Sequence, residues 1–328
     1  MNSLQGVEYD EPVGLTDDIE VVYRDAGHIL GSAICEVYVT ENGKRTKVVF
    51  SGDIGQWDVP IVNDPTLVAD ADYLLIESTY GDRLHVREPG KDRDAQLLEA
   101  VVAAHKKGGR LMIPSFSVER TQELIYSFYK AIKAGTFPGE KIFLDSPLAI
   151  RATEIFKKHR ECFDEEALLV FTKATEIPNL VYCPTAADSM KLNDYDKPCV
   201  IIAGSGMCNA GRIRHHLKHG LWNPKNSVLF VGYQATGTLG RVILDGAREV
   251  RMMGVSIVVQ ADVHKIGGFS AHADAGELMR WARGFTTKPK RTFVVHGEPQ
   301  AAAALRDRLS KEGFNAYVPG LGEQVELT

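Results

Sequence analysis

The sequence predicts an α/β fold built around a parallel β-sheet with helices on both faces. The main observation is that short apolar strands alternate with amphipathic helices through the middle of the chain. Strands joined by crossover helices pair in parallel, and the helices then cover both faces of the sheet. The composition agrees, since 44% of the 328 residues are hydrophobic and 25% are charged, as in soluble globular proteins. This length suggests two domains.

The first 80 residues are predicted to form strands joined by turns. The segments rich in Val, Ile, Tyr and Phe, which favour strands, are residues 19–24, 33–40 and 47–51. Asn42-Gly43 lies between the second and third segments and predicts a hairpin, because both residues tolerate positive φ. Residues 73–77 form a further short apolar strand that ends in an acidic residue.

Helices and strands are then expected to alternate to the end of the chain. The expected helices are residues 94–107, 119–133, 213–219, 275–284 and 300–313. The expected strands are residues 110–114, 141–144, 198–203, 227–231, 256–260 and 292–295. In the first helix, Leu97 and Val101 recur at helical spacing, and Gly108-Gly109 stops the pattern.

Charge and cysteine content exclude several classes of protein. A net charge of −5 excludes nucleic-acid binding over the whole surface, so polyanion binding would need a local basic patch. The five cysteines are widely spread without a C-x-x-C motif, which argues against a disulfide framework or a thiolate zinc site. No apolar run reaches the roughly 18 residues of a membrane span, and residues 1–11 lack a signal-peptide pattern. We therefore expect a cytoplasmic protein with reduced thiols and no membrane partner.

Five polar residues lie in tight loops, most of them where an apolar strand ends. They are His28, Asp53, Glu77, His272 and His296. Loops at strand ends carry function more often than strand interiors do. Imidazole together with carboxylate is the ligand set of a hydrolytic zinc site. Taken singly, each residue can also be explained as a capping or turn residue, and composition alone does not decide between the two explanations.

The loops around these residues contain specific sequence motifs. Residues 25–33 read DAGHILGSA, residues 51–53 SGD, residues 77–81 ESTYG, residues 269–274 FSAHAD and residues 296–298 HGE. In this order and spacing they resemble the third and fourth metal motifs and the motifs A, B and C of the β-CASP branch of the metallo-β-lactamase superfamily. These zinc-dependent nucleases process RNA and include bacterial and archaeal relatives of the cleavage-and-polyadenylation endonuclease. The resemblance extends over nearly the whole chain, and it implies a zinc-dependent ribonuclease.

The resemblance implies a role for each of the five residues. His28 would bind one zinc ion, His296 a second, and Asp53 would bridge the two ions. Glu77 would orient His272, and His272 would donate the proton to the leaving oxygen. A histidine at motif C accompanies RNA substrates in this family, so that single-stranded RNA is the expected partner.

The resemblance also implies a division into domains. Residues 1–81 and 263–328 would form an αββα metallo-β-lactamase sandwich that is incomplete at its N-terminal side. Residues 82–262 would form an inserted parallel α/β domain, the β-CASP domain, which clamps RNA.

The insertion contains a candidate phosphate site. The loop Gly204-Ser205-Gly206-Met207 lies between a predicted strand and a predicted helix, so that backbone N–H groups and the helix dipole would point at one spot. Basic residues follow, up to His219, and a solvated helix face is the alternative explanation. The expected phosphate contacts are Ser205, Gly206, Met207, Arg212, Arg214, Arg120 and Gln234. A separate metal pair of His215 and His219 is disfavoured, because no acidic residue is near in sequence.

Arg120 and Gln234 lie in two segments, residues 113–123 and 231–241, that resemble family segments facing the cleft. The family usually has glycine where Val118-Glu119 stand. The aromatic residues of these segments would either stack on bases or be buried in the core.

The family's second metal motif, H-x-H-x-D-H, is absent from these 328 residues, of which only 27 precede His28. We expect a truncated form that begins at an internal Met of a longer gene, because a scaffold has no use for half a site. A non-catalytic RNA-binding or scaffolding paralogue is the alternative. A nucleotide- or sugar-phosphate-binding α/β module is a second alternative, but it leaves the five loop residues unexplained. We also consider that the protein forms a homodimer.

Overall fold

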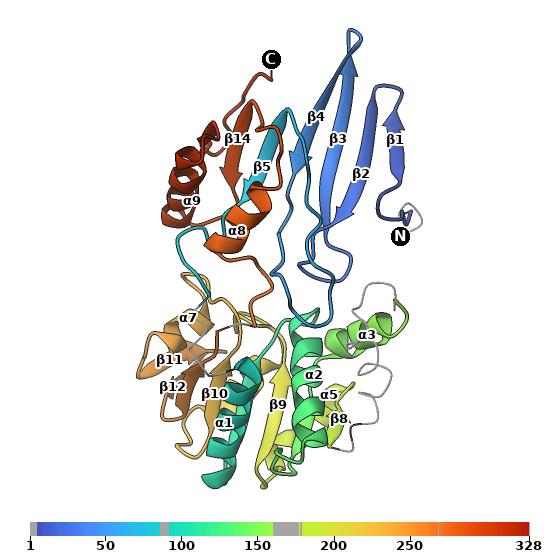
Figure 1. Ribbon diagram of the computed structural model, residues 1–328. Helices are drawn as coiled ribbons and strands as arrows, with labels where there is room; N and C mark the ends of the chain where they lie inside the picture. The colour runs from blue at the N-terminus through green and yellow to red at the C-terminus, as the bar shows by residue number, and fades with distance from the viewer. Residues whose placement is uncertain (1–4, 86–91, 160–176, 178, 268, 328) are drawn as a thin grey trace. The chain divides into compact units, whose positions relative to one another are not determined.

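The computed structural model describes residues 5–85, 92–159, 177, 179–267 and 269–327, and the chain divides into two compact units (Figure 1). Unit 1 comprises Met1–His85 and Ala271–Thr328, and unit 2 comprises Val86–Ser270. The domain boundaries expected from the sequence, 81/82 and 262/263, differ from these. The second one falls inside strand β13 (Asp262–Lys265), which pairs with a strand of unit 2.

Unit 1 is built on a seven-stranded mixed sheet in the order β1-β2-β3-β4-β5-β14-β15. Its strands are β1 (Pro12–Thr16), β2 (Ile19–Asp25), β3 (Ala33–Glu41), β4 (Lys44–Phe50), β5 (Tyr73–Glu77), β14 (Arg291–Val295) and β15 (Ala316–Tyr317). Neighbours from β1 to β4 are antiparallel, and neighbours from β4 to β15 are parallel. The helices are α8 (Ala275–Ala282) and α9 (Pro299–Lys311).

The predicted hairpin joins β3 to β4. Asn42 and Gly43 have φ of 50° and 77°, and Glu41 pairs with Lys44 across the turn. Positive φ at both central residues gives a turn whose twist matches that of the two strands. The prediction of this hairpin from Asn-Gly is therefore confirmed.

One face of the unit 1 sheet packs against α8 and α9. Strand residues such as Leu74, Ile76 and Val294 are fully buried in one apolar cluster with Trp281 of α8 and Leu305 of α9. Alternate residues along a strand point to opposite faces, so the register of β5 and β14 is fixed by this cluster. The register in turn fixes where Glu77 stands.

Unit 2 contains a six-stranded, all-parallel sheet in the order β13-β10-β6-β9-β7-β8. Besides β13, this sheet contains β6 (Arg110–Pro114), β7 (Lys141–Leu144), β8 (Leu180–Tyr182), β9 (Cys199–Ala203) and β10 (Ser227–Phe230). Two further strands, β11 (Glu249–Met252) and β12 (Val255–Val258), lie outside it. The helices among the described residues of this unit are α1 (Arg93–Lys106), α2 (Arg120–Lys133), α3 (Pro147–Phe156), α5 (Ala186–Lys191), α6 (Ile213–Gly220) and α7 (Leu239–Leu244), with a 3₁₀ turn at Leu192–Asp194.

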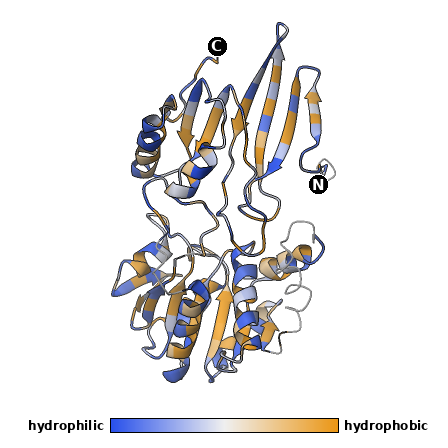
Figure 2. Cartoon of the chain, in the orientation of Figure 1, coloured by the Kyte–Doolittle hydropathy of each residue, from blue (hydrophilic) through white to orange (hydrophobic). Residues whose placement is uncertain are grey.

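Helices cover both faces of the parallel sheet, as the alternating pattern predicted. Val101 of α1 and Leu124 of α2 pack in one cluster with Ile113 of β6. Leu217 of α6 packs in a second cluster with Met112, the neighbour of Ile113 on the same strand. Strand β9 is hydrophobic along its length, as a central strand buried on both faces must be (Figure 2).

One predicted strand of unit 2 is present but does not join the main sheet. Residues 256–260 were expected to continue the alternation, but β12 instead forms an antiparallel hairpin with β11, outside the main sheet. Three of the four residues of β12 are exposed, so that apolar content alone was misleading there. The strand that joins the main sheet is β13, which carries charged residues at both ends and was not predicted.

The cysteines of the described residues carry free thiols, as expected. Cys183, Cys199 and Cys208 are buried, Cys35 is half-buried, and Cys162 lies outside the described residues. None of the helices in the part of the chain that the structure describes is long and apolar enough to cross a membrane.

Candidate active site

The carboxyl ends of four strands meet at one edge of the unit 1 sheet. Strands β2 and β4 run in the same direction because β3 is antiparallel to both, and β5 and β14 are parallel to β4. Glu77 ends β5, His296 directly follows β14, and Asp53 and His28 lie three residues beyond β4 and β2. The topology therefore brings four of the five predicted site residues to a single edge.

Glycines let two of these loops approach each other closely. Gly27 has a φ of 62°, and the backbone N–H of Gly55 donates to the carbonyl oxygen of Ala26 at 2.9 Å. A Cβ on Gly55 would lie 1.8 Å from the carbonyl oxygen of Gly27. No side chain fits there, so glycine is required for the loops of His28 and Asp53 to meet.

His272 joins the site through backbone contacts with the same loop. It forms an isolated antiparallel bridge with Gly55, and the N–H of Ala273 donates to the carbonyl oxygen of Ile54 at 2.7 Å. Asp274 then begins α8 with a capping box, in which its side chain accepts from the N–H of Glu277. The residue is thus fixed at both sides, although 195 residues separate it from Glu77.

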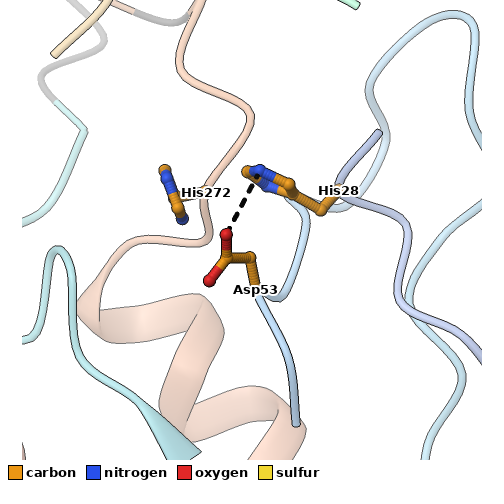
Figure 3. Close-up of side chains that lie close together, drawn as sticks. All are labelled: His28, Asp53 and His272. Atoms are coloured by element: carbon orange, nitrogen blue, oxygen red, sulfur yellow. Dashed lines mark ion pairs between the residues drawn. The ribbon is translucent and has the colours of Figure 1, made fainter. Parts of the chain in front are cut away.

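Asp53 lies between two histidines. Its Oδ2 is 3.8 Å from Nε2 of His28, and its Oδ1 is 3.2 Å from Nε2 of His296. Ligand atoms of His28, Asp53 and His272 all lie within 4.8 Å of one another, and Figure 3 shows these three side chains pointing toward one point. The His28 side chain is 12% exposed and that of His296 62% exposed.

Glu77 holds the ring of His272. Its Oε1 lies 3.3 Å from Nδ1 of His272 and also accepts from the N–H of Ile54 at 2.7 Å, while Oε2 accepts from the N–H of Thr79. Burial raises the pKa of Glu77, but the hydrogen bond and positive charge of His272 outweigh it and leave the pKa below its ordinary value. Glu77 is therefore a buried carboxylate that stays ionised.

The donor set fits a metal ion. Burial, followed by the positive charge of His272, lowers the pKa of His28 to about 4, so this ring is neutral at physiological pH and can bind a metal without losing a proton. Its Nδ1 is buried without a hydrogen-bond partner among the described residues, and its Nε2 faces Asp53. Imidazoles around one carboxylate are ligands that suit zinc.

The lowered pKa of His28 predicts a pH dependence of the metal-free fold. Between pH 6.5 and about 4 the unfolded chain binds a proton at His28 that the folded chain does not bind, so stability falls as the pH falls through this window. The expected loss is up to roughly 3 kcal/mol, since each pH unit corresponds to about 1.4 kcal/mol. Urea unfolding with a chelator present, from pH 7 to pH 4, measures it. His28→Gln should show a flatter profile than the wild type and than the exposed control His215→Gln; parallel profiles would contradict the account.

The residues expected to contact phosphate lie in unit 2, and several are engaged inside the protein. Arg212 donates to Oδ1 of Asp145 at 2.7 Å and to the carbonyl oxygen of Cys183 at 2.6 Å. Arg120 is buried and paired with Glu123. The amide of Gln234 is buried and donates to the carbonyl oxygen of Gly206 at 2.9 Å.

The remaining candidates shape the loop that follows β9. The N–H of Ala210 donates to Oγ of Ser205, the carbonyl oxygen of Met207 accepts from the N–H of Gly240, and Arg214 donates to the carbonyl oxygen of Asn209. A Cβ on Gly206 would lie 2.5 Å from the ring of Phe116. Phosphate contact by these residues stays a prediction, and their structural partners are now known.

His216 corrects the expected basic surface on α6. It was grouped with the exposed basic residues that follow Arg212, but it is 3% exposed and its Nε2 lies 2.6 Å from Oδ2 of Asp145. Asp145 itself directly follows β7 and was missed, although the same strand-end signal would have found it. The pair His215 and His219 is not part of any group of metal-binding side chains among the described residues.

Two family models and several known proteins are similar to this chain. The family model of the Beta-Casp domain matches residues 121–243, and that of the Zn-dependent metallo-hydrolase RNA specificity domain matches residues 256–319. Ribonuclease TTHA0252 of Thermus thermophilus is 36% identical over 330 residues, covering 100% of this chain and 74% of that protein. The chain belongs to the β-CASP metallo-β-lactamase family.

Other β-CASP relatives carry different names. The transcription termination factor FttA of Methanosarcina mazei is 31% identical over 317 residues, covering 93% of this chain and 49% of that protein. An RNase J-like protein of Methanocaldococcus jannaschii is 32% identical over 300 residues, covering 91% of this chain and 68% of that protein. The chain thus spans about half the length of FttA. Its β-CASP relatives include ribonucleases and transcription termination factors of a zinc-dependent, RNA-specific metallo-hydrolase family.

Proposed function

We propose that this β-CASP protein hydrolyses phosphodiester bonds of single-stranded RNA with two zinc ions. The observation that carries the proposal is that the two carboxylate oxygens of Asp53 face two different imidazoles, those of His28 and His296. This arrangement suits an aspartate that bridges two ions, with one histidine on each. The matched RNA specificity domain and the name of the Thermus relative support RNA as the substrate.

When bound, zinc would supply a Lewis acid that activates water and offsets charge on the phosphate. Two features of the chain favour zinc binding. His28 is held neutral, with the pKa lowered to about 4 by its burial, so its nitrogen is ready to bind a metal. The N–H of Ile54, next to Asp53, is bonded to the buried Glu77, which fixes the loop that carries Asp53.

Glu77 and His272 would act on the leaving oxygen. Because Glu77 stays ionised and lies 3.3 Å from Nδ1, it stabilises the protonated ring of His272 and sets its direction. The opposite nitrogen then donates its proton to the oxygen that departs from phosphorus. An imidazole held by a carboxylate also occurs as a zinc ligand, and the metal content of a His272 variant separates the two roles.

The two units would have different roles. Unit 1 would be the part of an αββα metallo-β-lactamase sandwich that carries the motifs, and unit 2 would be the β-CASP insertion that clamps the RNA strand. The carboxyl edge of a parallel sheet is where such folds bind ligands. The loop Gly204–Met207 lies at that edge of unit 2, directly after β9.

Binding of single-stranded RNA is expected to depend strongly on salt. Each phosphate contact releases condensed counterions, so several contacts lower the affinity by roughly 10²-fold or more between 50 and 200 mM salt. Fluorescence anisotropy with a labelled single-stranded RNA, and with a DNA duplex of the same length as the comparison, measures this. An affinity that barely changes with salt, or a preference for the duplex, would contradict phosphate recognition of RNA.

A protein of these 328 residues alone is expected to hold zinc weakly and to cleave little RNA. It supplies His28 and Asp53 to one ion and Asp53 and His296 to the other, whereas a catalytic zinc typically has three protein ligands. We call a protein in which a segment with the family's H-x-H-x-D-H motif precedes these residues the completed protein. Zinc content by mass spectrometry and cleavage of RNA should both rise in the completed protein.

The comparison tests the proposed function directly. Two tightly bound zinc ions in the 328-residue protein, or turnover at about 1–10³ s⁻¹, would show that other residues complete the site. RNA binding without cleavage in the completed protein would instead support the non-catalytic, scaffolding alternative.

A further inference from the structure

A second histidine, His85, holds the loop that carries His272. Its Nε2 lies 2.9 Å from the backbone carbonyl oxygen of His272, and its backbone N–H donates to Oδ2 of Asp274 at 2.9 Å. The N–H of Ala275 also donates to the carbonyl oxygen of Arg83 at 3.0 Å. Residues 83–85 therefore bond to the loop 272–275 at three points.

The chemistry of the carbonyl group fixes the role of the His85 ring. A carbonyl oxygen only accepts, so Nε2 of His85 must carry the hydrogen of this bond. The rings of Tyr80 and His85 pack in an edge-to-face arrangement at a centroid distance of 4.8 Å, and Tyr80 is buried. The ring of His85 is thus oriented on one side by packing and on the other by its hydrogen bond.

Two of the contacts on His272 come from one short segment of the chain. Glu77 bonds to the ring of His272, and His85, eight positions along, bonds to its backbone. A side chain that must donate a proton needs its backbone fixed as well as its ring, because small displacements lower the rate of proton transfer. The distance of 3.3 Å between Glu77 and His272 leaves little room for further lengthening.

We propose that His85 is a positioning residue for His272. By donating to the carbonyl oxygen of His272 it fixes the peptide that carries the ring, so that the ring stays on Glu77. This inference rests on the proposed role of His272 as the proton donor. It assigns no contact with RNA or zinc to His85.

The test uses the 328-residue protein, metal-free, with ¹⁵N-labelled histidine. In the wild type, NMR should show a hydrogen on Nε2 of His85, and a protected Nδ1–H signal of His272, assigned by its loss in His272→Gln. In His85→Ala, exchange of that signal with water should become about tenfold faster or more, the effect expected for the loss of one hydrogen bond. His85→Gln should retain the protection, because its side-chain amide can donate from a similar position. Leu84→Ala, an exposed neighbour, should match the wild type.

The possible results distinguish a failure of this inference from a failure of the proposed function. An unchanged His272 signal in His85→Ala overturns the positioning role, and so does a failure of His85→Gln to restore it. If His85→Ala does not fold, wild-type His85 unprotonated at Nε2 overturns it, and protection in His85→Gln supports it. Neither zinc nor RNA enters the measurement, so absence of cleavage in the completed protein would overturn the proposed function alone.

Discussion

Replacing Asp53 with Asn in the completed protein is expected to remove zinc and to lower RNA cleavage by about 10³-fold or more. The amide is neutral, and it presents only one oxygen where the carboxylate presents one to His28 and one to His296. Losing metal stabilisation of several kcal/mol corresponds to this factor, at about 1.4 kcal/mol for each tenfold change in rate. Zinc content by mass spectrometry and single-turnover cleavage measure the two effects.

A matched control exists on the same loop. Asp58 is exposed, and its φ of 56° is one that asparagine tolerates, so Asp58→Asn should keep both zinc and activity. An Asp53→Asn protein that retains two zinc ions would remove Asp53 from the bridging position.

His272→Ala is expected to lower kcat by about 10²–10⁴-fold while zinc stays bound. Without the imidazole the leaving oxygen must depart without a proton from this residue. Glu77 is not left without partners, since the N–H groups of Ile54 and Thr79 still donate to it, so the fold should persist. The rate of cleavage at saturating RNA, compared with zinc content in the same preparation, measures the separation of the two properties.

Loss of zinc in His272→Ala would assign His272 to the metal. The structure makes this comparison necessary, because a nitrogen of His272 lies within 4.8 Å of ligand atoms of His28 and Asp53. Glu77→Gln extends the test: a neutral partner should lower cleavage, whereas zinc should stay bound if His272 is the proton donor.

Much of the site could be predicted because local signals and topology agree. His28, Asp53, Glu77 and His296 stand at or just beyond strand ends, and the directions of β2, β4, β5 and β14 bring those ends together. His272 was harder to place from its surroundings, since it reaches the site through a backbone bridge with Gly55 rather than through a strand. Its motif identified it where periodicity could not.

The features of the site that were not predicted from the sequence depend on contacts between residues far apart in the chain. His216 and Arg212 look like exposed basic residues, but both bond to Asp145, about 70 positions earlier in the chain. No local pattern reports that a charge is paired in this way. His85 was likewise invisible, because its partner is a backbone oxygen 187 residues away.

The strands show the same limit of prediction from the local sequence. The strands 73–77, 110–114 and 141–144 were predicted with their observed bounds, because apolar runs between turns mark buried strands. Strand β13 is mostly polar, with the sequence Asp-Val-His-Lys, and joins the sheet through its pairing with β10. Pairing of this kind depends on the tertiary structure and overrides local propensity.

The positions of zinc in a crystal of the completed protein test the central claim most directly. Diffraction data collected on either side of the zinc absorption edge locate the ions. We predict two zinc peaks, one on each side of Asp53, with His28 bound to one ion, His296 to the other, and His272 bound to neither. A single zinc ion held together by His28, Asp53 and His272 would contradict both the bridging role of Asp53 and the role of His272 as the proton donor.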